Sequence, residues 1–163
     1  MMMVAQKNII ISMISEHISD KEGVYSRTAL RLNINNIPNT TQLRNMELLA
    51  DEIFEPLRTY ANGPIKINSF FRSPELNKAI GGSTKSQHCH GQAIDLDDTY
   101  GHLTNAEMFN FIREHLEFDQ MIWEFGDDDN PDWVHVSYVS PKENRNRCLK
   151  AYKHKGKTAY KII

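Results

Sequence analysis

The spacing of apolar residues along the chain predicts helices in its first half and mostly strands in its second. Between residues 40 and 57, apolar side chains recur at every third or fourth position, which is typical of a helix with one face toward a core. Thr40 or Thr41 is expected to cap this helix, because a hydroxyl oxygen accepts a hydrogen bond from the first free backbone N–H groups. Pro56 is expected to kink or end it, since proline lacks an N–H group.

After residue 62 the pattern changes to short segments separated by turn residues. Two further helices are predicted: a short one over residues 74–80 that stops at Gly81-Gly82, and one that begins at a Thr104-x-x-Glu107 capping box. Residues 82–91 show no periodicity and predict a loop. The predicted strands span residues 65–71, 92–96, 120–125 and 133–138, and a final hairpin joins 147–153 to 158–162 around Lys155-Gly156.

The order of these elements predicts an α+β fold in which helices flank a small antiparallel sheet. With 163 residues and no linker or repeat, the chain is expected to form one domain over residues 1–163, and we expect a monomer. Hydrophobic residues make up 40% and charged residues 25%, which favours neither disorder nor a membrane-embedded class. The net charge of −2 provides no general attraction for a polyanion, so we expect no nucleic-acid partner.

The N-terminal residues give no clear sign of export. The apolar run from Ile9 to Ile14 is short, one lysine precedes it, and no small-residue cleavage site follows, so we interpret it as the start of the folded domain. No other stretch approaches the length of a transmembrane helix, so we expect no integral membrane segment. Cys89 and Cys148 lack the paired spacing of a zinc ribbon or a redox motif, and a disulfide between them stays open.

The densest group of polar residues runs from Ser86 to Asp95. His88 and Asp95 stand seven residues apart where the predicted loop meets a strand, and zinc accepts both imidazole nitrogen and carboxylate oxygen. His135 lies in the apolar strand 133–138, where a buried histidine needs a partner. Three protein ligands leave one coordination position open for water, as in catalytic zinc sites. We therefore expect a zinc site formed by these two histidines and Asp95.

Two neighbouring residues offer alternatives. In an extended segment His90 shares a face with His88, so a His-x-His pair is a rival ligand set, although it leaves Asp95 without a role. Cys89 beside a histidine suggests a nucleophilic peptidase, but successive side chains of an extended chain leave opposite faces, so we interpret Cys89 as a packing residue. The histidines expected to be structural or solvated are His17, His102, His115 and His154.

Three segments, taken together and in order, resemble the signature of one peptidase family. They are Ser-Phe-Phe-Arg-Ser at residues 69–73, Ser-x-His-x-x-Gly-x-Ala-x-Asp at 86–95, and Trp-Val-His-Val-Ser at 133–137. In the first segment, Phe70 stands where the family usually has glycine. The family is that of the zinc D-alanyl-D-alanine carboxypeptidases of VanY type and the related phage L-alanyl-D-glutamate endopeptidases. The resemblance implies the Hedgehog/DD-peptidase fold.

The resemblance also implies that His88, Asp95 and His135 bind zinc. In the family, a glutamate three residues before the last histidine ligand takes the proton from the attacking water. This chain has Asp132 at that position, one methylene shorter. Glu124, on the neighbouring predicted strand, is the alternative base.

Three residues are candidates for contact with the substrate, and the resemblance assigns the first of them. Arg72 corresponds to the family arginine that faces the substrate, and its fixed charge suits a terminal carboxylate or a developing oxyanion. Ser86 and Gln87 are expected to bind substrate or to orient His88.

The expected function is zinc-dependent hydrolysis of peptide bonds in peptidoglycan stem peptides, as a D,D-carboxypeptidase or an L,D-type endopeptidase. Without a clear export signal, we expect a cytoplasmic or phage-associated protein that acts on the cell wall. The alternative is a non-catalytic, zinc-stabilised binding or structural module on the same fold. The shorter side chain of Asp132 is the feature that keeps this alternative open.

Overall fold

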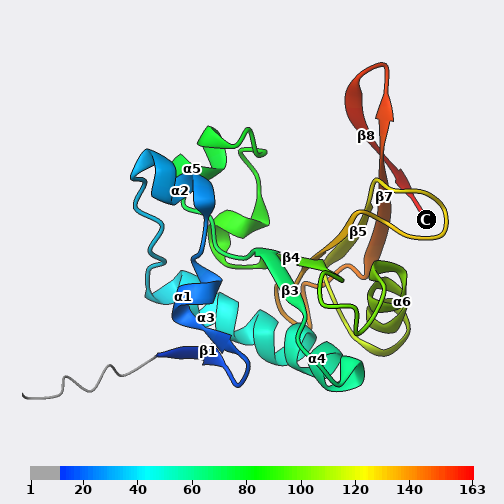
Figure 1. Cartoon of the computed structure of the whole chain (residues 1–163), viewed down its shortest axis with the longest axis horizontal. Helices are drawn as coiled ribbons and strands as arrows, with labels where there is room; N and C mark the ends of the chain where they lie inside the picture. Colours follow the sequence, from blue (N-terminus) through cyan, green and yellow to red (C-terminus); the bar gives the residue numbers. More distant parts are fainter. Residues whose placement is uncertain (1–11) are drawn as a thin grey trace, which may run out of the picture.

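A computed structural model describes residues 12–163. Residues 9–11 of the predicted N-terminal apolar run lie outside the described residues. Ile14, at the end of that run, is described and is buried. The main feature is a six-stranded sheet with the strand order β3-β4-β6-β5-β7-β8 (Figure 1). Its strands are β3 (Lys66–Ser69), β4 (Ala93–Asp97), β5 (Gln120–Glu124), β6 (Trp133–Ser137), β7 (Arg147–His154) and β8 (Lys157–Ile162). A separate pair, β1 (Met13–Ser15) and β2 (Ile18–Ser19), is antiparallel.

The α+β class is confirmed, and the pairing of β7 adds one feature that the sequence did not indicate. Strands β5 and β6 form the predicted antiparallel pair, and β7 and β8 form the predicted hairpin. Residues 138–146 carry the chain across to the far side of β5, so β7 runs antiparallel to β6 and therefore parallel to β5. The tail hairpin is thus an extension of the main sheet, and Figure 1 shows its outer end projecting away from the helices α4 and α6.

One long helical segment covers the predicted helix between residues 40 and 57. It consists of α3 (Thr40–Leu49), a π-helical turn (Ala50–Phe54) and α4 (Glu55–Ala61). The cap is Asn39 and neither of the expected threonines, because the Asn39 side chain accepts from the Gln42 N–H while Gln42 Oε1 accepts from the Asn39 N–H. Pro56 does not end the segment. The Glu55 N–H donates to the Ala50 carbonyl, and Pro56 lies in the first turn of α4, where a missing N–H is tolerated.

The predicted helix after Thr104 is α6 (Asn105–His115), with both hydrogen bonds of its capping box present. The apolar faces of α3, α4 and α6 pack with one face of the sheet into a single main core. The shorter helices are α1 (Asp20–Gly23), α2 (Arg27–Leu32) and α5 (Pro74–Ala79). Within residues 12–163, no helix has the length and apolar character needed to cross a bilayer.

Candidate metal centre

Three chain segments bring His88, Asp95 and His135 together. His88 lies in a 3₁₀ helix, η2 (Gln87–His90), within the predicted loop, and this helix leads into β4. Asp95 in β4 is the direct cross-strand partner of His135 in β6, and such partners point to the same face of a sheet. His88 Nε2 is 3.2 Å from Asp95 Oδ2, and His135 Nδ1 is 2.9 Å from Asp95 Oδ1. One ligand atom from each residue lies within 4.8 Å of the others.

The orientation of His88 is fixed by its second ring nitrogen. Nδ1 is 2.7 Å from the carbonyl oxygen of Phe70 and donates to it, since a carbonyl only accepts. Nε2 then carries the lone pair and faces the cluster. The His88 side chain is only 1% exposed, and among the described residues Nε2 is a buried nitrogen without a hydrogen-bond partner. A buried, unpaired nitrogen is costly in a metal-free protein, and a metal ion would satisfy it.

The protonation states suit a cation. Burial lowers the pKa of His88, which favours the neutral imidazole that binds metal. Burial by itself raises the pKa of Asp95, but the two histidines more than offset this effect and hold it far below its usual range. Two imidazole nitrogens and one carboxylate match the donor set of a catalytic zinc site with one open position. The residues present therefore fit the zinc ion that the sequence suggested.

His90 and Cys89 lie outside this cluster. The 3₁₀ turn replaces the extended backbone on which the His-x-His alternative depended, and His90 is exposed with its carbonyl bound by Asn45. Cys89 is half-buried, burial raises the pKa of its thiol, and its carbonyl accepts from Gln42. A raised pKa disfavours the reactive thiolate. Cys89 and Cys148 are both free thiols, so the structure contains no disulfide between them.

Of the two candidate bases, Glu124 lines the cavity of the metal cluster, and Asp132 is not among the residues that line it. Asp132 is exposed in a bend before β6, where its N–H donates to the Glu124 carbonyl. Glu124 is only 8% exposed and lines one cavity of about 420 Å³ with His88 and His135. Burial, reinforced by Asp95 and opposed by His135, raises the pKa of Glu124 to about 7. A carboxyl group with this pKa is suited to accept a proton near neutral pH.

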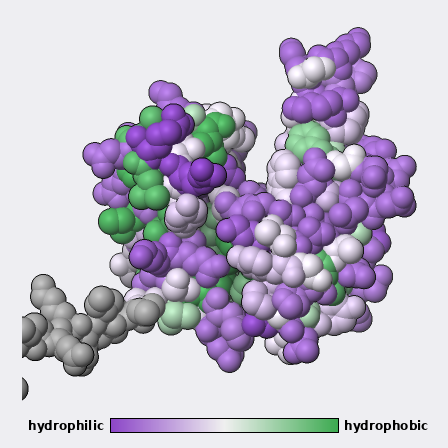
Figure 2. Space-filling model, in the orientation of Figure 1, coloured by the Kyte–Doolittle hydropathy of each residue, from purple (hydrophilic) through white to green (hydrophobic). Residues whose placement is uncertain are grey.

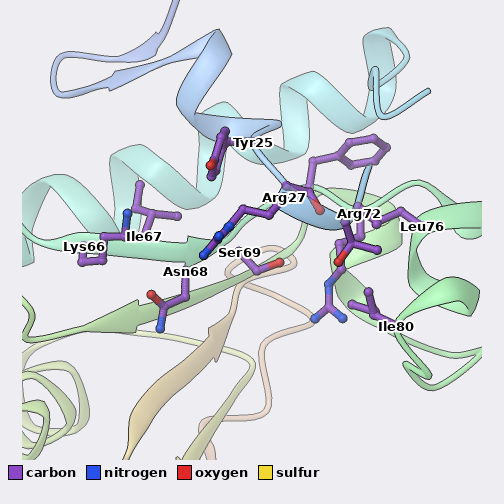
Figure 3. Close-up of a pocket in the computed structure, with 12 residues that line it drawn as sticks. Tyr25, Arg27, Lys66, Ile67, Asn68, Ser69, Arg72, Leu76 and Ile80 are labelled. Carbon is purple, nitrogen blue, oxygen red and sulfur yellow. The ribbon is translucent and has the colours of Figure 1, made fainter. Parts of the chain in front are cut away.

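Arg72 connects the metal cluster to a second cavity. Its N–H donates to the His88 carbonyl, and its guanidinium lies 3.8 Å from Asp95 and donates to Asn77 Oδ1. Nε is buried and has no hydrogen-bond partner among the described residues. Arg72 also lines the larger cavity of about 730 Å³ beside β3 (Figure 3), where Arg27 extends from α2 over the strand. Arg72 is therefore placed to contact a ligand that spans both spaces.

Ser86 and Gln87 line the cavity and also hold its loop in place. Ser86 Oγ accepts from the His88 N–H, and Gln87 Nε2 donates to Asp119 Oδ2 at 2.8 Å. Asp119 was not identified from the sequence. It is buried and accepts two further bonds from the guanidinium of Arg145, at 2.9 and 2.8 Å. The Asp119 carboxylate thus connects the loop that carries His88 to the segment before β7.

Asp119→Asn is expected to destabilise the protein by about 1.5–3 kcal/mol at pH 7, because a charged hydrogen-bond acceptor is lost. Burial raises the pKa of Asp119, but Arg145 and Gln87 hold it below its usual value overall. A carboxyl group whose pKa is lower in the folded protein than in the unfolded chain stabilises the fold at pH values above its unfolded pKa. This contribution is lost as the pH falls through the folded pKa. Urea unfolding at pH 7 and pH 3 checks this. The difference between the two proteins should be smaller at pH 3 than at pH 7, and an equal difference at both values would contradict the ion-pair explanation.

Several cavity residues come from the tail hairpin and were missed by the sequence analysis. Arg147, Leu149 and Tyr160 line the same cavity as His88 and Glu124. No local motif marks them, because their position depends on the parallel pairing of β7 with β5. His17, which was expected to be structural or solvated, makes a structural contact, since its Nδ1 lies 2.7 Å from Glu55 Oε2. That contact connects the β1–β2 turn to α4, and neither residue lines the cavity of the metal cluster.

A comparison with protein families supplies independent evidence. The family model described as Peptidase M15 matches residues 15–137. That range includes the metal cluster, Arg72 and Glu124, and it ends before the tail hairpin. No curated protein gives a significant match. Because the matched range covers most of the chain, the protein belongs to the peptidase M15 family, which includes the zinc D-Ala-D-Ala carboxypeptidases of VanY type.

Proposed function

We propose that this protein is a zinc-dependent peptidase that hydrolyses peptide bonds in peptidoglycan stem peptides. The observation that carries the proposal is the convergence of the unpartnered His88 Nε2 with Asp95 and His135 at a cavity that also contains Glu124. Membership of the M15 family supports peptidase activity. The whole chain is proposed to act as a single domain and as a monomer, delivered to the cell wall by a phage or by release from the cytoplasm.

Zinc, when bound, would polarise the scissile carbonyl and lower the pKa of the attacking water. His88, Asp95 and His135 would hold the ion, and the His88–Phe70 hydrogen bond keeps the correct nitrogen directed at it. Glu124 accepts the proton of the water and delivers it to the leaving amine, a role that its raised pKa and its burial favour.

Arg72 contributes a fixed positive charge beside the cluster. Its side chain is 14% exposed, so its charge is only weakly screened by solvent. We assign it to the substrate carboxylate or to the oxyanion that forms as water attacks the carbonyl. Ser86 and Gln87 act mainly by holding the His88 loop, through the His88 N–H and Asp119 respectively.

The non-catalytic alternative depended on the short side chain of Asp132. Glu124 supplies a buried carboxyl group in the cavity of the cluster, so a competent base does not require Asp132. No feature of the described residues favours the alternative over hydrolysis.

The proposal predicts that removal of zinc abolishes hydrolysis and that zinc restores it. Purified protein would be analysed for metal content and incubated with muropeptides, whose products are identified by mass spectrometry. Treatment with a chelator should reduce cleavage to the background level, and one equivalent of zinc should recover it. Stoichiometric zinc with no cleavage of any stem would overturn the enzymatic part of the proposal. Full activity after complete metal removal would overturn the metal part.

A further inference from the structure

The tail hairpin forms one side of the cavity that holds the metal cluster. The strand register explains how. Ile122 in β5 pairs with His135 on one side and with Leu149 of β7 on the other. Since cross-strand partners point to the same face, Leu149 stands on the face of the sheet that carries the metal cluster.

A second row of side chains runs parallel to the first. Glu124 pairs with Ala151 of β7, and Ala151 pairs with Tyr160 of β8. Ala151 is fully buried, so Glu124 and Tyr160 flank a small, covered methyl group on this face of the sheet. Burial, together with the nearby carboxyl group of Glu124, raises the pKa of the Tyr160 phenol. Both the cavity lining and this electrostatic effect therefore place Tyr160 toward Glu124.

The cavity has an apolar floor and cationic sides. Ile122, Leu149 and Ala151 form a small apolar cluster separate from the main core. Lys85 and Arg147 line the cavity, and neither makes an ion pair among the described residues. Figure 2 shows a hollow between the tail hairpin, whose surface is mostly hydrophilic, and the part of the molecule that contains α2 and α5.

We propose that the tail hairpin completes a substrate subsite beside the metal cluster, for a peptide residue that has a small apolar side chain and a free carboxylate. Arg147, together with Lys85, which lines the same cavity, binds the carboxylate by a charge-assisted hydrogen bond. Ile122 and Leu149 contact the side chain, and Tyr160 forms the outer wall. This subsite rests on the proposed function, and it lies partly outside residues 15–137 that match the family.

The hairpin provides matched controls on its other face. Lys161 pairs with Lys150, and Tyr152 pairs with Ala159, so their side chains point away from the cavity. Tyr152 and Tyr160 are 38% and 54% exposed, which makes their truncations comparable. The variants are therefore Arg147→Gln against Lys161→Gln, and Tyr160→Ala against Tyr152→Ala. Thermal unfolding of each variant checks that the fold is retained.

The test uses three stem peptides with zinc-loaded protein: one ending in D-Ala as the free acid, its C-terminal amide, and an amide with a D-Glu carboxylate. Arg147→Gln should raise KM for the free acid about tenfold with little change in kcat, and leave the plain amide unchanged. Tyr160→Ala should raise KM for all three peptides. The D-Glu amide distinguishes a carboxylate at the chain end from one within the peptide. Both control variants should behave like the wild type.

A second readout does not require turnover. Zinc-loaded Glu124→Gln protein should bind the free-acid peptide in calorimetry, and adding Arg147→Gln should weaken that binding about tenfold. The subsite would be overturned if Arg147→Gln weakened the binding of the acid and the amide equally, or if Arg147→Gln and Lys161→Gln weakened binding equally. Either result would leave the peptidase proposal intact. A wild type that takes up no zinc and cleaves no peptide would instead overturn the proposed function, and the subsite with it.

Discussion

Replacement of His88 by alanine is expected to abolish both zinc binding and hydrolysis. His88 is 1% exposed, and its Nε2 is buried with no hydrogen-bond partner among residues 12–163, so a metal ion would satisfy it. Loss of a partner that merely orients a zinc ligand costs about 10–100-fold in affinity, so loss of the ligand itself should cost at least about 100-fold. Metal content after dialysis, together with hydrolysis of muropeptides, measures both effects.

The same substitution has a consequence for stability. Zinc that binds only the folded protein stabilises it, by about 4 kcal/mol at a thousand times its Kd. Added zinc should therefore raise the Tm of the wild type but leave the Tm of His88→Ala unchanged.

His90→Ala is the matched control, because His90 is exposed two residues further along the same 3₁₀ helix. It should retain zinc, activity and the zinc-dependent rise in Tm. If His90→Ala lost zinc and His88→Ala kept it, the result would indicate His90 as a zinc ligand in place of His88, and the proposed cluster would be rejected.

Glu124→Gln is expected to lower kcat by about 10²–10⁴-fold while zinc remains bound, because a general base contributes rate enhancement of that size. Glutamine has almost the same shape as glutamic acid, so the cavity and the sheet register should be preserved. The carboxyl group is buried at 8% exposure and close enough to His135 and Asp95 for both to influence its pKa. Steady-state kinetics and metal analysis on the same preparation separate loss of the base from loss of the ion.

Asp132→Asn is the control that decides between the two candidate bases. Asp132 is exposed, and its contacts to β5 and α6 are made by its backbone, which accepts from Asn105 Nδ2 and donates to Glu124. The asparagine variant should keep kcat within about twofold of wild type, as expected for a surface substitution. A large loss in Asp132→Asn with full activity in Glu124→Gln would reverse the assignment.

The sequence by itself determined the local parts of this protein. Interactions among residues close in the chain produce the Thr104-x-x-Glu107 capping box, the apolar periodicity of α3 and the alternating strands. The structure contains each of these features. His88 and Asp95 belong to the same class, because a loop of fixed length joins them. The donor types favoured zinc, and the family resemblance implied the same three ligands.

Tertiary structure decided which distant side chains share the cavity. His90 was separated from His88 by a 3₁₀ turn, a backbone state that periodicity does not indicate. Glu124 is buried and Asp132 is exposed because the pairing of β5 with β6 and the bend before β6 determine which carboxyl group faces the interior. The tail hairpin reached the cavity only through a parallel pairing across the sheet. Strand order and register arise from burial of the whole core, so no short segment specifies them.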